Sequence, residues 1–378
     1  MRICFLIRSL GIGGAERQLS LLATGLHHRG HDVTVCVTYA GGAMAAELEA
    51  RGVPVVALQK RSRWDLTGVV ASLRRMVRER APDVLHGYMP TSNLLTLLAA
   101  GAGGPAVVWG VRASHLDWGA YDWMARASFE ATRRFASRAD LVIANSEAGR
   151  RFHVAQGYPA ERTIVVPNGV DTARHCRDEP GRVRQRAAWG VPDGAPLVGL
   201  VGRLDPMKDH ATFLRACARV AAARPDARFV CVGDGPAPFS AALRALAGDL
   251  GIAAQTIWVE PRTEVTAMYS ALDVHVSASC FGEGFSNAIA EAMACEVPSV
   301  TTDVGDAATV VGSTGRVVPP REPALLADAV LALLATDLPA LGRDARARVV
   351  REFGVDQLVS RTLAALEPVV AGRARRTA

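Results

Sequence analysis

The sequence contains very little lysine. Its 43 basic residues include only two lysines, Lys60 and Lys208, and the formal net charge is +6. Arginine is therefore used almost wherever a general positive charge suffices. A position that keeps lysine indicates a need for a compact ammonium group rather than a planar guanidinium.

Aromatic and charged residues are also sparse. They make up 6% and 21% of the 378 residues, whereas hydrophobic residues make up 49%. This composition excludes a disordered chain and a coiled coil. Basic clusters such as Arg74-Arg75 and Arg133-Arg134 have no interleaved aromatic residues and no nucleic-acid motif, so we expect no nucleic-acid partner. An anionic substrate or an anionic membrane surface fits the clusters better, and a plain solvated face fits them equally well.

Paired cysteines and long apolar runs are absent from the sequence. The seven cysteines form no CxxC pair, and most lie in apolar segments such as residues 229–232. They predict buried free thiols in a reducing compartment, not a disulfide framework or a zinc site. The uncharged stretch 89–111 is broken by glycine and proline, and the apolar start is short and broken by Arg8. We therefore expect neither a transmembrane helix nor a signal peptide, and a cytoplasmic location.

Short apolar runs alternate with helical segments, which is the pattern of parallel α/β architecture. The alternation stops in a polar segment that contains proline and glycine, and then restarts. We therefore predict two α/β units facing a cleft, with ligands at the carboxyl ends of the strands. The predicted parts are a first domain at 1–170, a linker at 171–195, a second domain at 196–355 and a C-terminal helix at 356–378.

A glycine loop that includes Gly13 and Gly14 lies between the first strand and the first helix. Glycines there allow backbone N–H groups to approach an anion at the helix start. A dinucleotide fingerprint needs a further small residue where Glu16 stands and an acidic residue at the end of the second strand, which ends in Tyr39. A nicotinamide-dependent dehydrogenase is therefore disfavoured. The loop is either an anion site or a tight turn without a ligand.

A turn after the strand at 197–201 carries Gly202, Arg203 and Lys208. Two cations in one turn can converge on a diphosphate, to which arginine offers a bidentate fork and lysine a point charge. Such cations stabilise the negative charge that grows on a departing diphosphate. The alternative is a pair of solvated charges, which the scarcity of lysine disfavours.

Two glutamates stand eight residues apart where a loop leads into a helix. Glu283, flanked by glycines, is suited to accept hydrogen bonds from sugar hydroxyls, or it is a solvated loop acid. Glu291 lies among alanines and other apolar residues of the helix. A charge is out of place there unless it has a bound partner, and paired ribose hydroxyls would provide one.

The start of this helix is a second candidate phosphate site. Its first N–H groups have no partner within the helix and carry partial positive charge. We expect donor binding by Gly284, Phe285, Ser286 and Asn287, with Ser286 or a near neighbour as the helix cap.

These motifs resemble those of retaining glycosyltransferases of family 4, which have the GT-B fold of two Rossmann-like domains. Four segments carry the resemblance in the expected order, and together they extend over nearly the whole chain. They are residues 13–16, 166–171, 202–208 and 283–291, the last with the E-x7-E pattern.

The resemblance implies a role for each motif. Arg203 and Lys208 would hold the donor diphosphate, Glu291 the nucleotide ribose and Glu283 the donor sugar, while Gly14 would approach the diphosphate from the first domain. No metal ion and no other cofactor is implied. The last helix would cross back to the first domain. One departure is Glu296, which stands where the family often has glycine and leaves the local turn in question.

The implied activity is retaining, metal-independent transfer of a hexosyl or N-acetylhexosaminyl group from a nucleotide-diphosphate sugar to a glycan or lipid-linked acceptor. Cell-surface polysaccharide biosynthesis and peripheral contact with an anionic membrane are the expected setting. The departing phosphate would take the acceptor proton, and a nucleophilic Glu283 is the less favoured scheme. A nucleotide-sugar epimerase and a non-catalytic nucleotide-sugar-binding protein remain alternatives.

In the first domain, the resemblance favours His115, in a loop after a strand, for a contact with the donor sugar. His86, Arg112 and Asn145 are weaker candidates near the acceptor, each with an ordinary structural role as the alternative. Asn168 is expected to shape the turn between the domains rather than to touch substrate.

Overall fold

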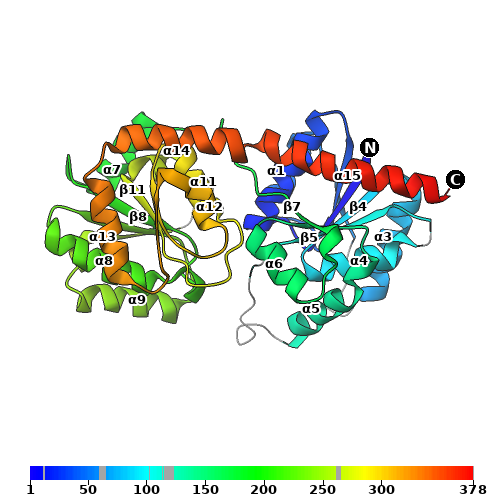
Figure 1. The fold of residues 1–378 in the computed structure, drawn as a ribbon, viewed down its shortest axis with the longest axis horizontal. Helices are drawn as coiled ribbons and strands as arrows, with labels where there is room; N and C mark the ends of the chain where they lie inside the picture. Colours follow the sequence, from blue (N-terminus) through cyan, green and yellow to red (C-terminus); the bar gives the residue numbers. More distant parts are fainter. Residues whose placement is uncertain are drawn as a thin grey trace. The chain divides into compact units, whose positions relative to one another are not determined.

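The computed structural model describes residues 1–11, 13–58, 65–101, 103–112, 114, 123–260 and 265–377. The chain divides into two compact units, one of residues Met1–Gly169 with Val355–Ala378 and one of residues Val170–Gly354. In each unit helices alternate with strands along the chain (Figure 1). The predicted pair of parallel α/β units is thereby confirmed.

Within the described residues, the first unit contains a seven-stranded parallel sheet in the order β3-β2-β1-β4-β5-β6-β7. Its strands are β1 (Arg2–Ile7), β2 (Asp32–Val37), β3 (Val55–Ala57), β4 (Val84–Tyr88), β5 (Ala106–Val111), β6 (Leu141–Ala144) and β7 (Thr163–Val165). Its helices are α1 (Gly14–His28), α2 (Ala43–Ala50), α3 (Leu66–Arg80), α4 (Pro90–Ala100), α5 (Trp123–Phe135), α6 (Glu147–Ala155) and α15 (Val355–Thr377).

The second unit contains, among the described residues, a six-stranded parallel sheet in the order β10-β9-β8-β11-β12-β13. Its strands are β8 (Leu197–Val201), β9 (Arg228–Val232), β10 (Thr256–Val259), β11 (Val274–Ser277), β12 (Ser299–Thr302) and β13 (Arg316–Val318). Its helices are α7 (Glu179–Ala188), α8 (His210–Ala223), α9 (Ala237–Asp249), α10 (Thr266–Ala271), α11 (Asn287–Ala294), α12 (Ala307–Val311), α13 (Pro323–Leu334) and α14 (Leu338–Phe353).

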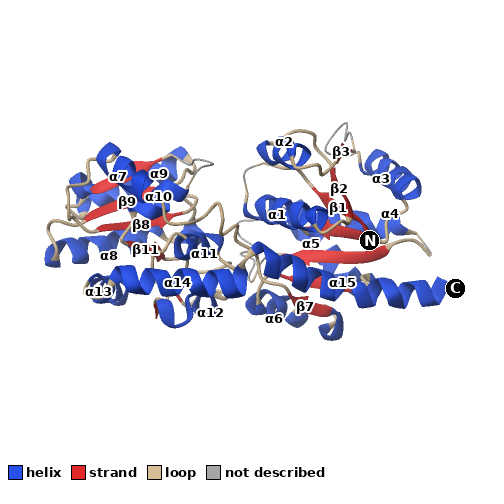
Figure 2. Cartoon of the chain, turned by 90° about the horizontal axis from the view of Figure 1, so that it is seen from above, coloured by secondary structure: helices blue, strands red, loops and turns tan. Residues whose placement is uncertain are grey.

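Both sheets are covered by helices on their two faces (Figure 2). Strand β1 shows the consequence: Phe5 joins the core cluster that includes α1 and α15, while Leu6 joins the cluster on the opposite face with α3. A strand buried on both sides needs apolar residues at every position. This requirement explains why the strands read as continuous apolar runs rather than as alternating patterns.

The last helix, α15, belongs to the first unit, as the predicted fold requires (Figure 1). Leu358, Val359 and Leu366 are buried in the core cluster that contains α1. A Cβ atom on Gly25 of α1 would lie 2.5 Å from Val359 Cγ2, so glycine permits the close approach of the two helices. Arg29 adds a hydrogen bond of 2.8 Å to the Ser360 hydroxyl.

Residues 171–195 do not form a separate linker, because they fold as part of the second unit. Helix α7 begins after Asp178, whose carboxylate accepts a 2.8 Å hydrogen bond from Gly181 N. Arg182 donates to Asp273 at 2.6 Å, and Arg186 donates to the same carboxylate at 3.2 Å. The polar composition that suggested a linker therefore serves a half-buried charge network that attaches α7 to the sheet.

The cysteines are free thiols, as the composition indicated. All seven cysteines are free, and five of them are buried, while Cys176 and Cys280 are partly buried. Among the described residues, no single helix is both long enough and apolar enough to cross a membrane, although the pair α13 and α14, bent by 105°, meets both criteria together.

The turn at Glu296 forms in spite of the missing glycine. Glu296 has φ of 62°, in the left-handed region. Val297 N donates to Ala292 O and Glu296 N donates to Met293 O, both at 3.0 Å, which is the Schellman pattern that commonly ends a helix. Glycine is favoured at this position because it has no Cβ to strain the left-handed backbone.

We predict that Glu296→Gly stabilises the protein. Relief of the left-handed strain outweighs the added freedom of the unfolded chain, for a gain of roughly 0.5–1 kcal/mol in the free energy of unfolding. Calorimetric unfolding of the full chain would show a higher midpoint for the transition of the second unit. Gly342→Ala is the opposing control, because its Cβ would lie 2.1 Å from Glu296 O and should lower that midpoint. A lower midpoint for Glu296→Gly would refute the strain argument.

Candidate active site

The turn after β8 is held in a defined shape by its own acidic residues. Asp205 accepts a 2.9 Å hydrogen bond from Met207 N, and residues Pro206–Lys208 form a short 3-10 helix. Asp209 has φ of 46° and caps α8 by accepting from Thr212 N at 3.1 Å and from Thr212 Oγ1 at 2.7 Å. These contacts fix the backbone on both sides of Lys208.

The loop after β9 packs against this turn, a contact that the sequence analysis did not predict. Gly233 and Gly235 follow β9, and a Cβ atom on them would lie 2.0 Å from Gly202 O and 2.2 Å from Leu204 O. Leu204 N also donates to Asp234 O at 2.7 Å. Only glycine allows this approach. The sequence showed the glycines after a strand, but not what they would lie against.

The two predicted phosphate cations differ in their surroundings. The Arg203 side chain is 71% exposed and lies 3.9 Å from Asp205. The Lys208 side chain is 17% exposed and forms an ion pair with Glu283, whose side chain is 12% exposed. The structure therefore brings Lys208 and Glu283 directly together and leaves Arg203 at the surface, where it is not held against either of them. Neither Lys208 nor Glu283 is a solvated surface charge.

The loop that carries Glu283 is tied in place by groups that the sequence did not single out. Ser279 Oγ donates to Glu283 Oε1 at 3.1 Å. Gly305 has φ of 66°, and its missing Cβ would lie 2.3 Å from Glu283 O. Asp306 N donates to Gly284 O at 3.0 Å.

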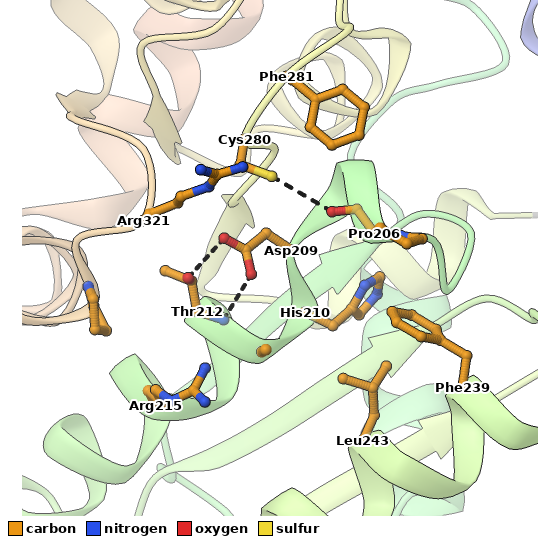
Figure 3. Close-up of a pocket in the computed structure, with 12 residues that line it drawn as sticks. Pro206, Asp209, His210, Thr212, Arg215, Phe239, Leu243, Cys280, Phe281 and Arg321 are labelled. Carbon is orange, nitrogen blue, oxygen red and sulfur yellow. Dashed lines mark hydrogen bonds between the residues drawn. The ribbon is translucent and has the colours of Figure 1, made fainter. Parts of the chain in front are cut away.

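The same loop is attached to the turn after β8 beside a cavity of about 610 Å³ (Figure 3). Cys280 N donates to Met207 O at 2.9 Å, and the Cys280 thiol donates to Pro206 O at 3.5 Å. Figure 3 shows Cys280 and Pro206 at one side of the cavity, with Arg321 nearby. The described residues that line this cavity include neither Lys208 nor Glu283, so the cavity lies next to the ion pair rather than around it.

The start of α11 differs in part from the prediction. Ser286 occupies the N-cap position, but its hydroxyl makes no capping hydrogen bond and, although buried, has no hydrogen-bond partner. Phe285 is 5% exposed and its ring packs against Phe353 at a centroid distance of 5.2 Å. The Phe285 side chain is therefore part of the core, and only its backbone remains suited to a ligand. The Ser286 hydroxyl is a buried polar group at a helix start that favours an anion.

Glu291 is buried rather than on the helix surface. Its exposed fraction is 6%, and its Oε2 accepts a 3.0 Å hydrogen bond from the Tyr269 hydroxyl. The Tyr269 ring in turn lies edge-on to His275 at 6.0 Å. The buried position agrees with the argument that a charge among alanines needs a partner, and Tyr269 is a partner that sequence reasoning missed.

Two buried histidines lie near Lys208. The pKa of His275 is lowered to about 3, first by burial and then by the charge of Lys208. The pKa of His210 is lowered to about 4 by the same two causes in the same order. Both side chains are neutral at pH 7, so neither histidine adds a positive charge beside Lys208.

In the first unit, Gly13 and Gly14 lie at the start of α1. Gly13 has extended backbone, and a Cβ on it would lie 2.2 Å from the Glu16 carboxylate. Glu16 therefore folds back over the helix start, a position that favours negative charge. The residue that argued against a dinucleotide site thus places its own carboxylate at the loop.

The remaining candidates of the first unit are His115, His86 and Asn145. His115 lies outside the described residues. His86 is buried, neither ring nitrogen has a hydrogen-bond partner, and its pKa is lowered to about 3 by burial and then by Arg112. Asn145 is buried next to Ser146. None of these contacts assigns a substrate role.

Residues 168–169, which follow β7, are held by contacts that the sequence did not reveal. Gln18 Nε2 donates to Gly169 O and Gly169 N donates to Gln18 Oε1, both at 2.8 Å. Arg112 donates to Asn168 Oδ1 at 3.0 Å and lies over the Tyr88 ring at 4.5 Å. Asn168 and Gly169 thus have structural partners, in keeping with a turn-shaping role.

Comparison with known proteins places this geometry in a family. Residues 12–174 match the family described as Glycosyltransferase Family 4, and residues 195–336 match Glycosyl transferases group 1. A GDP-mannose-dependent alpha-(1-6)-phosphatidylinositol monomannoside mannosyltransferase of Mycolicibacterium smegmatis is 31% identical over 279 residues, which are 71% of each chain. A D-inositol 3-phosphate glycosyltransferase of Geodermatophilus obscurus is 35% identical over 66% of this chain and 58% of its own length. The chain spans about half the length of other D-inositol 3-phosphate glycosyltransferases that it matches.

Solved structures share the fold. Anabaena HepE, determined in complex with UDP and glucose, superposes with a TM-score of 0.84 at 24% identity, covering 97% of this chain and 99% of HepE. The lipopolysaccharide glycosyltransferase WaaG superposes with a TM-score of 0.69 at 18% identity, covering 96% of this chain and 99% of WaaG.

Fold and family matches together define a glycosyltransferase of the GT-B fold. The chain belongs to glycosyltransferase family 4, as its motifs indicated.

We predict that the buried histidines destabilise the protein in acid. Unfolding returns them to a pKa near 6.5, so the unfolded chain binds more protons and the stability present above pH 6.5 is lost as the pH falls toward 4. Each such histidine changes the free energy of unfolding by up to about 1.4 kcal/mol per pH unit in this range.

Urea unfolding of wild type and His210→Asn between pH 7 and pH 5 measures this slope. The variant should lose about one histidine's share, because an amide does not titrate in this range. His28→Asn, at an exposed position, should keep the wild-type slope. Equal slopes for wild type and His210→Asn would show that His210 is not protonated on unfolding.

Proposed function

We propose that the chain catalyses retaining, metal-independent transfer of a hexosyl or N-acetylhexosaminyl group from a nucleotide-diphosphate sugar to a glycan or lipid-linked acceptor. The observation that carries the proposal is the partly buried Lys208–Glu283 pair, next to a helix start with an unpartnered buried hydroxyl. One cation, one carboxylate and an anion-favouring helix start thus lie at neighbouring strand ends of one sheet, which supports the proposed roles.

The chemical roles follow from the donors and acceptors available. An ammonium group has three N–H donors, so Lys208 can keep Glu283 and still donate to a phosphate oxygen. Arg203, whose side chain is largely exposed, can bind the same diphosphate as a bidentate fork. Glu283 accepts from sugar hydroxyls, and Glu291 accepts from ribose hydroxyls.

The transfer itself needs no protein nucleophile. The bond between the sugar C1 and the β-phosphate oxygen breaks, and a bond from C1 to the acceptor oxygen forms on the same face. The departing phosphate takes the acceptor proton. Lys208 and Arg203 stabilise the charge that develops on that phosphate, which is a role that metal ions have in other enzymes.

The donor sugar, its nucleotide base and the acceptor are to be identified by experiment. The mycobacterial relative uses GDP-mannose, and HepE was determined with UDP-glucose. A screen of labelled UDP- and GDP-sugars against the purified protein identifies the donor. Determination of the anomeric configuration of the product then tests retention. Cell-surface polysaccharide biosynthesis is the setting that we infer from the acceptor class.

We predict that Lys208→Ala nearly abolishes the slow release of nucleoside diphosphate from the donor in the absence of acceptor. Removal of one group that stabilises transition-state charge typically costs about 10²-fold to 10³-fold in rate. Arg184→Ala, which removes an exposed cation of the same unit, should release diphosphate at the wild-type rate.

Wild-type release by Lys208→Ala would contradict the role of Lys208 in charge stabilisation. An absence of both hydrolysis and transfer in the wild type, with donor still bound, would favour the non-catalytic binding protein. Interconversion of the donor sugar without transfer would favour an epimerase.

We also propose peripheral contact with an anionic membrane through the first unit. Helix α3 exposes Arg74, Arg75 and Arg78, and Arg74 donates to Leu98 O of α4 at 3.0 Å. Leu98 itself is 54% exposed. An exposed apolar side chain beside arginines suits the interface of a bilayer that carries acidic lipids.

We predict co-flotation with vesicles of mixed phosphatidylglycerol and phosphatidylcholine, and little binding to pure phosphatidylcholine. Binding should weaken as salt rises, because charge attraction is screened. The double variant Arg74→Glu and Arg75→Glu should lose most of the binding, whereas Arg224→Glu, in the second unit, should retain it. Equal binding to both vesicle types would refute an electrostatic contact.

A further inference from the structure

Tyr269 connects the Glu291 carboxylate to the core of the second unit. Tyr269 lies on α10 and is 1% exposed, while Glu291 lies on α11 and is 6% exposed. The tyrosine hydroxyl donates to Glu291 Oε2 at 3.0 Å. The two residues are 22 positions apart in the sequence, so the contact depends on how α10 and α11 pack.

The Tyr269 ring is itself held in one place. It lies edge-on to His275 of β11 at 6.0 Å. His275 Nδ1 is 3.1 Å from Ser299 Oγ of β12, which anchors the imidazole between two neighbouring strands. The hydroxyl that meets Glu291 therefore sits at the end of a rigid aromatic group packed against the sheet.

Helix α10, which carries Tyr269, is fixed by residues that precede the sheet. Arg182 donates to the carbonyl oxygens of Ser270, Ala271 and Leu272 at 3.0, 2.9 and 3.0 Å. Asp178 N also donates to the Ser270 hydroxyl at 3.1 Å. These bonds satisfy the carbonyl groups at the end of a helix of only six residues, whose own hydrogen bonds would not hold it.

A buried carboxylate among alanines needs such a partner. Its desolvation is unfavourable unless hydrogen bonds replace water, and a hydrogen bond to a charged acceptor is stronger than one between neutral groups. The bond also restricts the rotation of the Glu291 side chain. A carboxylate has two oxygens with about four lone-pair sites, enough in principle to accept from one tyrosine and from two sugar hydroxyls.

We propose that Tyr269 is a positioning residue that orients the Glu291 carboxylate toward the paired hydroxyls of the donor ribose. The inference rests on the proposed binding of ribose by Glu291. Tyr269 touches no substrate; it acts through the carboxylate.

The test compares ribose recognition in wild type, Tyr269→Phe and Glu291→Gln. Isothermal titration measures the affinity of each full-length protein for UDP, GDP and their 2′,3′-dideoxy counterparts, and the base that wild type binds more tightly is used throughout. The informative quantity is the ratio of the ribo to the dideoxy affinity. A loss of packing or stability lowers both affinities and leaves this ratio unchanged.

We expect wild type to prefer the ribonucleotide by about 10-fold or more, and Glu291→Gln to lose most of that preference. Tyr269→Phe should reduce the preference by about 5-fold while the dideoxy affinity changes by less than about 2-fold. The double variant should lose no more than Glu291→Gln alone, because the two residues act as a unit. Tyr158→Phe, a buried tyrosine of the first unit, should behave as wild type.

The outcomes separate the two proposals. If wild type binds ribo and dideoxy forms equally, the proposed ribose role of Glu291 fails. If Glu291→Gln loses the preference and Tyr269→Phe keeps it, the role of Glu291 stands and the inference for Tyr269 is overturned. A Tyr269→Phe variant that weakens both forms equally overturns it as well, because that result indicates a structural role alone.

Discussion

The ion pair between Lys208 and Glu283 is the interaction on which the rest of the site depends. It joins the turn after β8 to the loop after β11, two neighbouring strands of a parallel sheet. Both side chains are largely removed from water, so each needs the other for its charge to be tolerated. Loss of either partner would leave the other buried charge without its counter-ion, which links the chemistry of the site to the stability of its loops.

The loops around this pair are positioned by backbone contacts that tolerate little change. Gly233 and Gly235 allow the loop after β9 to lie against the turn after β8, and Gly305 allows a third loop to lie against Glu283. Cys280 adds hydrogen bonds between the two central loops. A preorganised arrangement of this kind lets charged groups act on a developing charge without first reorganising.

The segment before β8 takes part in the same arrangement. Its polar and arginine-rich composition is typical of a linker, yet Arg182 and Arg186 bind Asp273 and the carbonyl groups that end α10. The position of Tyr269, and through it that of Glu291, therefore depends on residues far away in the sequence. Composition alone cannot distinguish an exposed arginine from one whose guanidinium binds the carbonyl groups at the end of a helix.

Much of the fold was readable from the sequence, because a strand buried on both faces must be apolar throughout and glycines must stand where strands turn into helices. The scarcity of lysine and the position of Glu291 among alanines pointed to residues that prove to be partly or fully buried. The pairing of Lys208 with Glu283, the exposure of Arg203 and the contact of Tyr269 with Glu291 could not be read in this way. Local pattern reports the periodicity of one segment, whereas these contacts depend on which segments far apart in the chain come together, and that is decided only by the packing of helices and loops at the strand ends.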